Sequence, residues 1–265
     1  MLNLIHAEFY KLVKSTGFRV CVLLSSICAV SLITIAHALA AGNMSAANTG
    51  NASGLTELMI ISLLGSFMAG SLICGDFETK TIHDAVVCGK GRISVVICKT
   101  FVYVIIIAVL LLPYILTTIV AVSTGAKFTT PFVASTFIGI LFDASQSSIT
   151  AVSAGKIATV CLVTILVQAA RLSLCIPLAF KVRKPVVVMG VGFAINGLID
   201  FIISLINEID LINKLLSVTP YSRDYVILGL NTGSDILIKA AGSSILFLII
   251  MAGISYLLFK KAEIK

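Results

Sequence analysis

Six long runs of apolar residues, separated by short polar segments, restrict the fold of this chain more than any other feature. A helix that crosses the hydrocarbon core of a bilayer needs about 20 apolar residues. We predict spans at roughly residues 18–41, 58–74, 100–122, 158–180, 185–206 and 240–259. A seventh run, residues 131–142, has twelve residues, a length that suits an interfacial or re-entrant helix better than a span.

Composition excludes a soluble globular protein. Only 12% of the residues are charged and the mean hydropathy is +1.11, whereas a soluble domain carries about 25% charged residues. The chain lacks the polar side chains needed to cover a globule. We therefore predict an all-α, polytopic membrane protein in which residues 1–265 form a single transmembrane domain.

The placement of Lys and Arg predicts the orientation in the membrane, because basic residues favour cytoplasmic segments. With six spans and a cytoplasmic N-terminus, thirteen Lys and Arg residues fall in inner segments and five in outer ones. Both termini are then cytoplasmic. Attraction between these residues and anionic membrane lipid accounts for the net charge of +7 without any nucleic-acid partner.

Residues 1–16 have the periodicity of an amphipathic helix. Apolar residues recur at steps of three and four, namely Leu2, Ile5, Phe9, Leu12 and Val13. Such a helix lies on the membrane surface, and this one would lead directly into the first span. The alternative is an ordinary anchor next to the membrane.

The densest mixed-charge stretch, Cys74–Arg92, belongs to a loop over residues 75–99 that joins spans two and three on the predicted cytoplasmic side. Its pattern predicts a helix of about three turns over Phe77–Cys88, with Asp76 favoured at the N-terminal end and Gly89 at the C-terminal end. A short charged helix held by two spans is a structure that a soluble partner can bind. The alternative is a solvated loop that only connects the spans.

This arrangement resembles the permease subunits of type-2 ATP-binding-cassette exporters, the group that contains bacitracin-resistance and lantibiotic-immunity permeases. Those proteins have an amphipathic elbow helix, six spans, and a short coupling helix after the second span. The match is carried by Asp76, Glu78, Thr81, Gly89, Arg92 and Lys99. The sequence departs from the family at Lys80, where Gly usually precedes the Thr.

The resemblance implies that residues 75–99 dock on a separate ATPase subunit and transmit its motion. The coupling residues would be Asp76, Phe77, Glu78, Thr81, Asp84, Gly89 and Arg92. It further implies the plasma membrane of a bacterium, a second permease that is identical or similar, and an amphiphilic substrate such as an antimicrobial peptide or a lipid-like antibiotic. ATP and Mg²⁺ would bind the partner, since this chain contains no G-x-x-x-x-G-K-[ST] and needs no cofactor of its own.

Polar residues inside two spans form a second candidate site. Arg171 and Gln168 lie in span four, and Asn196 and Asp200 lie in span five. Ionisable groups in a bilayer are costly and usually face a partner or a wet path. If both helices are straight, a rise of 1.5 Å per residue places Arg171 and Asp200 about 9 Å apart along the membrane normal. The sequence leaves open a structural role, a substrate path and ion coupling.

Two other classes of function remain open at this stage. An ion-coupled secondary transporter would use Arg171 and Asp200, and a non-transporting immunity protein would bind a peptide without moving it. Enzyme and metal sites have no support, because the sequence contains neither H-E-x-x-H nor G-x-S-x-G and only three His. Small residues at Ser62, Ser66 and Gly70 predict a close helix approach, either within the chain or across a dimer.

Overall fold

The structure is a computed structural model that describes residues 2–42, 54–82, 91–125, 128, 135–146, 151–205, 216 and 218–261. Every regular element in these ranges is a helix. In chain order the elements are α1 (Leu2–Lys14), α2 (Thr16–Ala40), α3 (Glu57–Ala69), η2 (Gly70–Cys74), α4 (Gly75–Glu78), α6 (Arg92–Ser123), α7 (Thr136–Gln146), α8 (Ala151–Leu172), α9 (Cys175–Val182), α10 (Pro185–Leu205), α12 (Arg223–Val226) and α13 (Ser234–Lys261).

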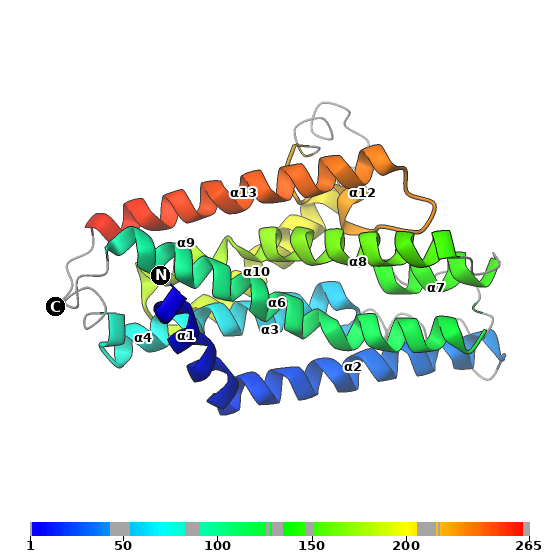
Figure 1. Cartoon of the computed structure of the whole chain (residues 1–265), viewed down its shortest axis with the longest axis horizontal. Coiled ribbons are helices and arrows are strands. Elements are labelled where there is room, and N and C mark those ends of the chain that lie inside the picture. The colour runs from blue at the N-terminus through cyan, green and yellow to red at the C-terminus, as the bar shows by residue number, and fades with distance from the viewer. Residues whose placement is uncertain are drawn as a thin grey trace.

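Six helical segments of the described chain are long and apolar enough to cross a membrane, as an all-α polytopic membrane protein requires. They cover Thr16–Ala40, Glu57–Glu78, Arg92–Ser123, Gly155–Val182, Pro185–Ile203 and Ser234–Lys260. The long helices run side by side as one bundle (Figure 1). Two bounds next to the charged stretch differ from the prediction. Span two continues to Glu78 and does not end at residue 74, and span three begins at Arg92 and not at residue 100.

The N-terminal helix α1 lies across one end of the bundle and meets α2 at a sharp elbow (Figure 1). Ser15 separates the two helices, and its Oγ accepts a hydrogen bond from the Phe18 amide at 3.5 Å. A hydroxyl at this position satisfies an amide that the first turn of a helix leaves unpaired. On α1, Leu12 and Glu8 are buried whereas Val13 is exposed. The helix therefore turns a carboxylate as well as apolar residues toward the bundle.

Span two contains a π-helical turn, η2, between α3 and α4. A Cβ atom at Gly70 would lie 2.8 Å from the backbone carbonyl oxygen of Pro185, so only glycine permits this close approach to the start of α10. A Cβ atom at Gly192 of α10 would likewise lie 3.0 Å from the hydroxyl of Ser66. The small-residue stripe on span two thus packs against α10 within the same chain.

Span four is divided into α8 and α9 by a break at Ser173 and Leu174. Pro177 explains the break, because a proline lacks the amide that would bond four residues back and its ring collides with that carbonyl. The carbonyl four residues back belongs to Ser173, and it accepts the amide of Ile176 at 3.0 Å instead. The break leaves the last carbonyls of α8 without helical partners inside the bundle.

Helix α7 overlaps the predicted short apolar run of residues 131–142 from Thr136 onward, whereas residues 131–134 of that run lie outside the described chain. Phe137, Ile138, Ile140 and Leu141 are buried, and the helix packs against α6 at the end of the bundle away from α1 (Figure 1). Its eleven residues reach about 16 Å, so α7 enters the bundle without crossing it. This geometry fits the re-entrant alternative better than an interfacial helix.

A buried carboxylate fixes the start of α7. Glu57, at the first turn of α3, accepts hydrogen bonds from the Ser135 hydroxyl and the Thr136 amide, each at 2.6 Å. A negative charge at a helix N-terminus is favourable because the unpaired amides there carry positive partial charge. At the other end of α7, Asp143 accepts the Leu230 amide at 2.9 Å, which ties the segment before α13 to the same helix.

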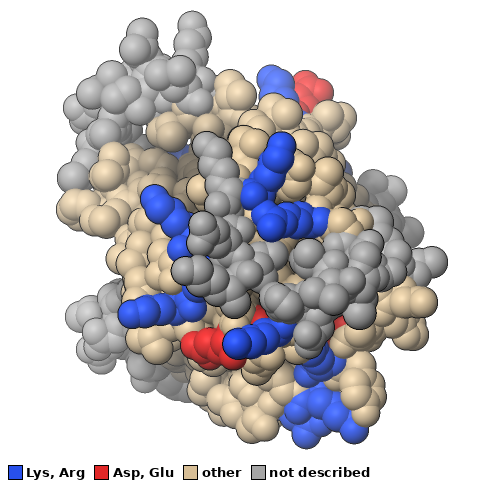
Figure 2. Space-filling model, turned by 90° about the vertical axis from the view of Figure 1, so that its left-hand side faces the viewer, with Lys and Arg blue, Asp and Glu red and all other residues tan. Residues whose placement is uncertain are grey.

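Basic residues gather at the end of the bundle where α1 lies (Figure 2). We call it the basic end and the opposite one the outer end. Placed there by their elements are Lys11, Lys14, Arg19, Lys80, Arg92, Lys99, Lys181, Arg183, Lys184 and Lys260. Lys156, Arg223 and Lys239 are the described basic residues of the outer end. Because Lys and Arg favour the cytoplasmic side of a membrane protein, their excess at the basic end predicts that this end is cytoplasmic.

Candidate functional site

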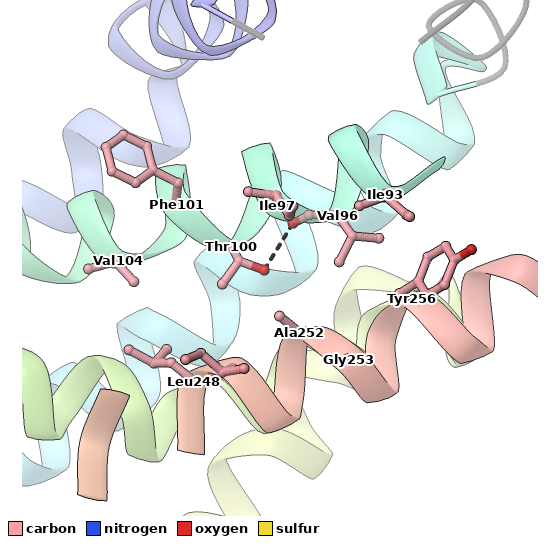
Figure 3. A pocket seen from close by; sticks show the side chains of 11 residues that line it. Ile93, Val96, Ile97, Thr100, Phe101, Val104, Leu248, Ala252, Gly253 and Tyr256 are labelled. Carbon is pink, nitrogen blue, oxygen red and sulfur yellow. Dashed lines mark hydrogen bonds between the residues drawn. The ribbon is translucent and has the colours of Figure 1, made fainter. Parts of the chain in front are cut away.

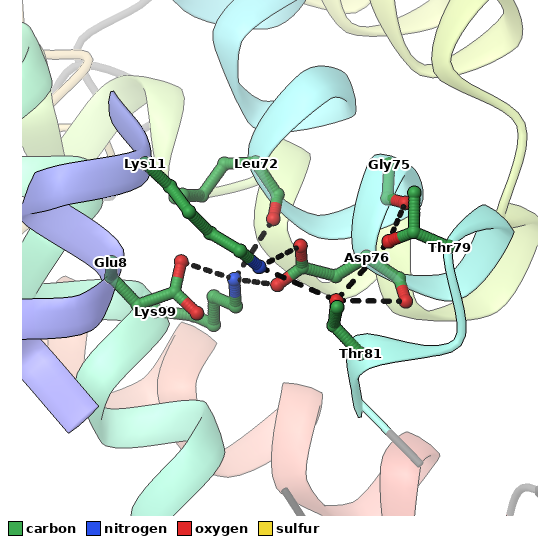
Figure 4. A network of polar contacts seen from close by, with 8 residues as sticks. All are labelled: Glu8, Lys11, Leu72, Gly75, Asp76, Thr79, Thr81 and Lys99. Carbon is green, nitrogen blue, oxygen red and sulfur yellow. Dashed lines mark hydrogen bonds and ion pairs between the residues drawn. The ribbon is translucent and has the colours of Figure 1, made fainter. Parts of the chain in front are cut away.

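An ion-pair network of Glu8, Lys11, Asp76 and Lys99 joins three helices at the basic end (Figure 4). The Lys99 ammonium donates to Glu8 Oε2 at 2.7 Å and to the Leu72 carbonyl at 3.0 Å. Its third partner is one oxygen of the Asp76 carboxylate. The side chain of Lys99 is only 2% exposed. A buried ammonium is tolerated here because all three of its N–H groups have acceptors and two of these are charged.

The second oxygen of Asp76 points toward α1. Lys11 donates to it at 2.9 Å and lies 3.4 Å from the hydroxyl of Thr81. Thr81 in turn donates to the main-chain carbonyl of Asp76 at 3.4 Å. Asp76 is therefore the member shared by α1, the end of span two, span three and the segment that begins at Thr81. Displacement of any one of these elements changes the contacts of the others.

The prediction that Asp76 stands at the N-terminal end of a helix over Phe77–Cys88 is wrong. Asp76 and Phe77 lie inside α4, which continues span two to Glu78. The chain then turns at Lys80, whose φ of +58° is left-handed, and a new helical turn begins at Thr81. Residues 83–90 lie outside the described chain, and so do the predicted coupling residues Asp84 and Gly89.

Phe77 contributes to packing at the basic end. Its ring meets those of Phe180 in α9 and Phe259 in α13 edge to face, with centroids 6.1 and 6.2 Å apart. The Arg183 guanidinium lies 4.7 Å from the centroid of the same ring, within the range of a cation–π contact. Through Phe77, the end of span two is packed against spans four and six.

The remaining predicted coupling residues have separate positions. Arg92 donates to the carbonyls of Phe259 and Lys260 at 3.1 and 2.6 Å, so it holds the last turn of α13. A cation there satisfies carbonyls that the helix end leaves unpaired. Glu78, by contrast, is exposed at the surface of the basic end. The structure thus brings Asp76 and Thr81 together, directs Phe77 and Arg92 toward spans, and leaves Glu78 accessible.

Sequence reasoning missed the roles of Glu8 and Lys11, which lie one turn apart on α1. The apolar periodicity of residues 1–16 predicts both on the polar face of a surface helix. The sequence feature that indicates a partner on α1 is Lys99, whose ammonium group lies within the apolar run of α6. A charge in such a place needs a partner of opposite sign, and Glu8 is an acid of the elbow helix that precedes the spans.

The intramembrane residues form a second cluster around the break in span four. Arg171, in the last turn of α8, forms an ion pair with Asp200 of α10. The long arginine side chain bridges the depth offset that separates the two residues along straight helices. The C-terminus of α8 also favours a cation, because its unpaired carbonyls carry negative partial charge.

Tyr221, from the segment before α12, completes this cluster. Its hydroxyl donates to the Arg171 carbonyl at 2.8 Å and lies 3.2 Å from Oδ1 of Asn196. The Arg171 guanidinium lies 5.2 Å from the centroid of the tyrosine ring. Burial raises the pKa of the Tyr221 hydroxyl, an effect that the nearby positive charge of Arg171 only partly offsets. The hydroxyl therefore remains a neutral donor.

The cluster also contains polar atoms that other described residues leave without hydrogen bonds. Nε2 of Gln168 and Nε of Arg171 are buried and lack a partner there. The Asp200 side chain is 42% exposed on the flank of α10. Unpaired donors in a bilayer cost free energy unless water or a ligand reaches them. The arrangement can hold a polar group of another molecule between α8 and α10.

No protein-family model matches the chain, and no curated protein matches it.

Proposed function

We propose that the chain is the membrane-spanning permease subunit of an ATP-driven exporter in a bacterial plasma membrane. It would act as a homodimer or beside a similar permease, with two separately encoded ATPase subunits that bind ATP and Mg²⁺. The substrate would be amphiphilic, an antimicrobial peptide or a lipid-like antibiotic, and would leave the cell. The resemblance of the charged stretch to such permeases suggested this function, and the geometry at the basic end supports it.

The observation that carries the proposal is the position of Asp76 in the ion-pair network. A partner that moves the segment beginning at Thr81 also moves a carboxylate bonded to Lys11 of α1 and Lys99 of α6. Rigid helices then transmit the displacement to the outer end. Phe77 supports the same role, because it connects the end of span two to spans four and six.

The cluster at Arg171 supports an amphiphilic path. A broken span in the middle of a bundle places main-chain carbonyls and a cation at membrane depth, where transporters commonly bind polar groups. The surrounding helices are apolar, so a molecule with an apolar body and a few polar groups suits both parts. Exposed Asp200 lies on the flank of α10, where a second permease could cover it.

Co-purification tests the proposal. Tagged chain from its native host, extracted in a gentle detergent, should retain an ATPase subunit in a ratio of about one to one. The Glu78→Lys variant reverses an exposed charge at the basic end and should lose the ATPase while inserting normally. Asp235→Lys, an exposed acid in the first turn of α13, is the matched control and should keep it. An intact complex without any ATPase contradicts the proposal.

One observation favours a second candidate, an ion-coupled secondary transporter. The ion pair of Arg171 and Asp200 lies inside the membrane with one partner partly exposed, as a protonation site would. In vesicles that contain only this chain, such a transporter would move substrate when a proton gradient is imposed and stop in Asp200→Asn. An exporter subunit would stay inactive there until its ATPase and ATP are added.

A further inference from the structure

A groove opens between α6 and α13, and its lining includes no residue of the ion-pair network or of the cluster around Arg171 (Figure 3). Its volume is about 520 Å³. Six residues of α6, from Ile93 to Val104, and five of α13, from Leu248 to Tyr256, line it. The hydroxyl of Thr100 bonds to the Val96 carbonyl at 2.9 Å, so the wall is apolar along its length.

The groove has the length of one lipid tail. From Ile93 to Val104 the wall covers twelve residues of α6, and the rise from the first to the last is about 16 Å. One leaflet of the hydrocarbon core is about 15 Å thick, half of the bilayer core. Ala252 and Gly253 create the hollow, and a Cβ atom on Gly253 would meet no other atom within 4 Å.

Positive charge marks the end of the groove that lies at the basic end. Arg92 immediately precedes the wall residue Ile93, and it donates to the carbonyl of Lys260 at 2.6 Å. Lys260, which follows the α13 wall, therefore lies close to the start of the α6 wall at Ile93. Lys260 is exposed. The Tyr256 hydroxyl points to this end of the groove (Figure 3), as aromatic residues at a membrane interface commonly do.

We propose that this groove is a binding site for an anionic phospholipid of the leaflet at the basic end. One acyl chain would lie between α6 and α13, and the phosphate would lie by Lys260, Arg92 and the Tyr256 hydroxyl. The basic end selects an anionic lipid over a neutral one, since each Lys or Arg near the surface attracts anionic lipid. The site is independent of the proposed transport function.

A tryptophan reporter tests the site, because the native chain contains no tryptophan. Leu248→Trp places a single indole at the far end of the groove. The protein is reconstituted in nanodiscs of phosphatidylcholine that contain a small fraction of brominated phosphatidylglycerol or brominated phosphatidylcholine. Bromine quenches the indole on contact, so the ratio of quenching measures the preference for the anionic lipid. We expect about a fivefold preference for each cation that contacts the phosphate.

Matched variants in the reporter background locate the site. Lys260→Gln should reduce the preference about fivefold, whereas Lys239→Gln, an exposed lysine at the outer end of the same helix, should leave it unchanged. Gly253→Leu fills the groove and should abolish the preference. Gly242→Leu adds the same side chain to α13 at another open position and should not.

Three results would overturn the proposal. Equal quenching by the two brominated lipids would show that the groove takes any lipid. Absence of quenching by both would show that protein, such as a second copy of the chain, covers it. A preference that survives Gly253→Leu would place the anionic lipid elsewhere. Native mass spectrometry of the unmodified chain provides a second measurement, in which retained phosphatidylglycerol should decrease with Lys260→Gln and not with Lys239→Gln.

Discussion

The hydroxyl of Tyr221 lies 2.8 Å from the main-chain carbonyl oxygen of Arg171 and donates a hydrogen bond to it. Arg171 lies in the last turn of α8, which ends at Leu172, where carbonyls lack the amides of a following helical turn. The Tyr103 hydroxyl, at 3.4 Å, reaches the next carbonyl, that of Leu172. The segment before α12 is thereby bound to the broken span, so the outer end and the intramembrane cluster move together.

Tyr221→Phe removes this donor and keeps the ring over Arg171. We expect the free energy of unfolding to fall by about 1 kcal/mol, because one buried carbonyl loses its partner. Reversible unfolding in mixed micelles measures the change. Tyr10→Phe is the matched control, since that ring is 64% exposed and its hydroxyl lies at the surface. A loss of equal size in both variants would contradict the assigned role of Tyr221.

Lys99→Met should destabilise the protein more strongly than any other single change in the ion-pair network. It leaves the buried carboxylate of Glu8 without its cation and leaves the partly buried Asp76 with Lys11 alone. Removing one partner of a buried ion pair costs about 3–5 kcal/mol. Lys14→Met, an exposed lysine on α1, should change little. The same unfolding experiment compares the two variants.

A second substitution distinguishes lost pairing from lost packing. Adding Glu8→Gln to Lys99→Met removes the carboxylate left unpaired, since Asp76 keeps its ion pair with Lys11. The double variant should therefore be more stable than Lys99→Met alone. If the two substitutions instead add their losses, Lys99 acts through packing and the network has no electrostatic role.

The helical spans could be predicted because bilayer thickness alone sets their length and apolarity. The elbow helix could be predicted from its periodicity. The burial of Glu8 could not, because a carboxylate on the polar face of a helix can be solvated by water or can pair with a buried lysine such as Lys99. The positions of Arg171 and Asp200 within apolar runs indicate that both charges need a partner or a wet path. Their pairing depends on the helix break and on side-chain reach, neither of which follows from counting residues along straight helices.

Tyr221 shows why part of the site was hidden from the sequence. It lies in a segment of ordinary composition, and only the tertiary fold brings it against span four. The turn at Lys80 was hidden for another reason. A helical pattern continued across it from Phe77 to Thr81, and the sequence carries no glycine there to mark the left-handed residue.

Lys80→Gly should stabilise the turn between α4 and the segment that begins at Thr81. Lys80 has φ of +58°, a conformation that costs an L-residue with a Cβ atom about 1 kcal/mol and costs glycine nothing sterically. Hydrogen exchange at the amides of residues 79–82 should therefore slow in Lys80→Gly. Lys80→Ala is the control, because alanine keeps the Cβ atom and the strain. Equal effects of both variants would show that loss of the charge, and not of the strain, is responsible.

The close approach of Gly70 to Pro185 predicts that alanine destabilises the protein at Gly70 but not at Gly190, a glycine with open space around it. Gly70→Ala would place a Cβ atom 2.8 Å from the Pro185 carbonyl oxygen. Backbone atoms on both sides must then move, and such overpacking costs about 1–3 kcal/mol. Gly190→Ala, at an exposed position of α10 with no other atom within 4 Å, should leave the free energy of unfolding unchanged or raise it by up to about 1 kcal/mol. Reversible unfolding of the two variants tests the close packing of span two on α10. A decrease in the free energy of unfolding in both variants, or in neither, would contradict that packing.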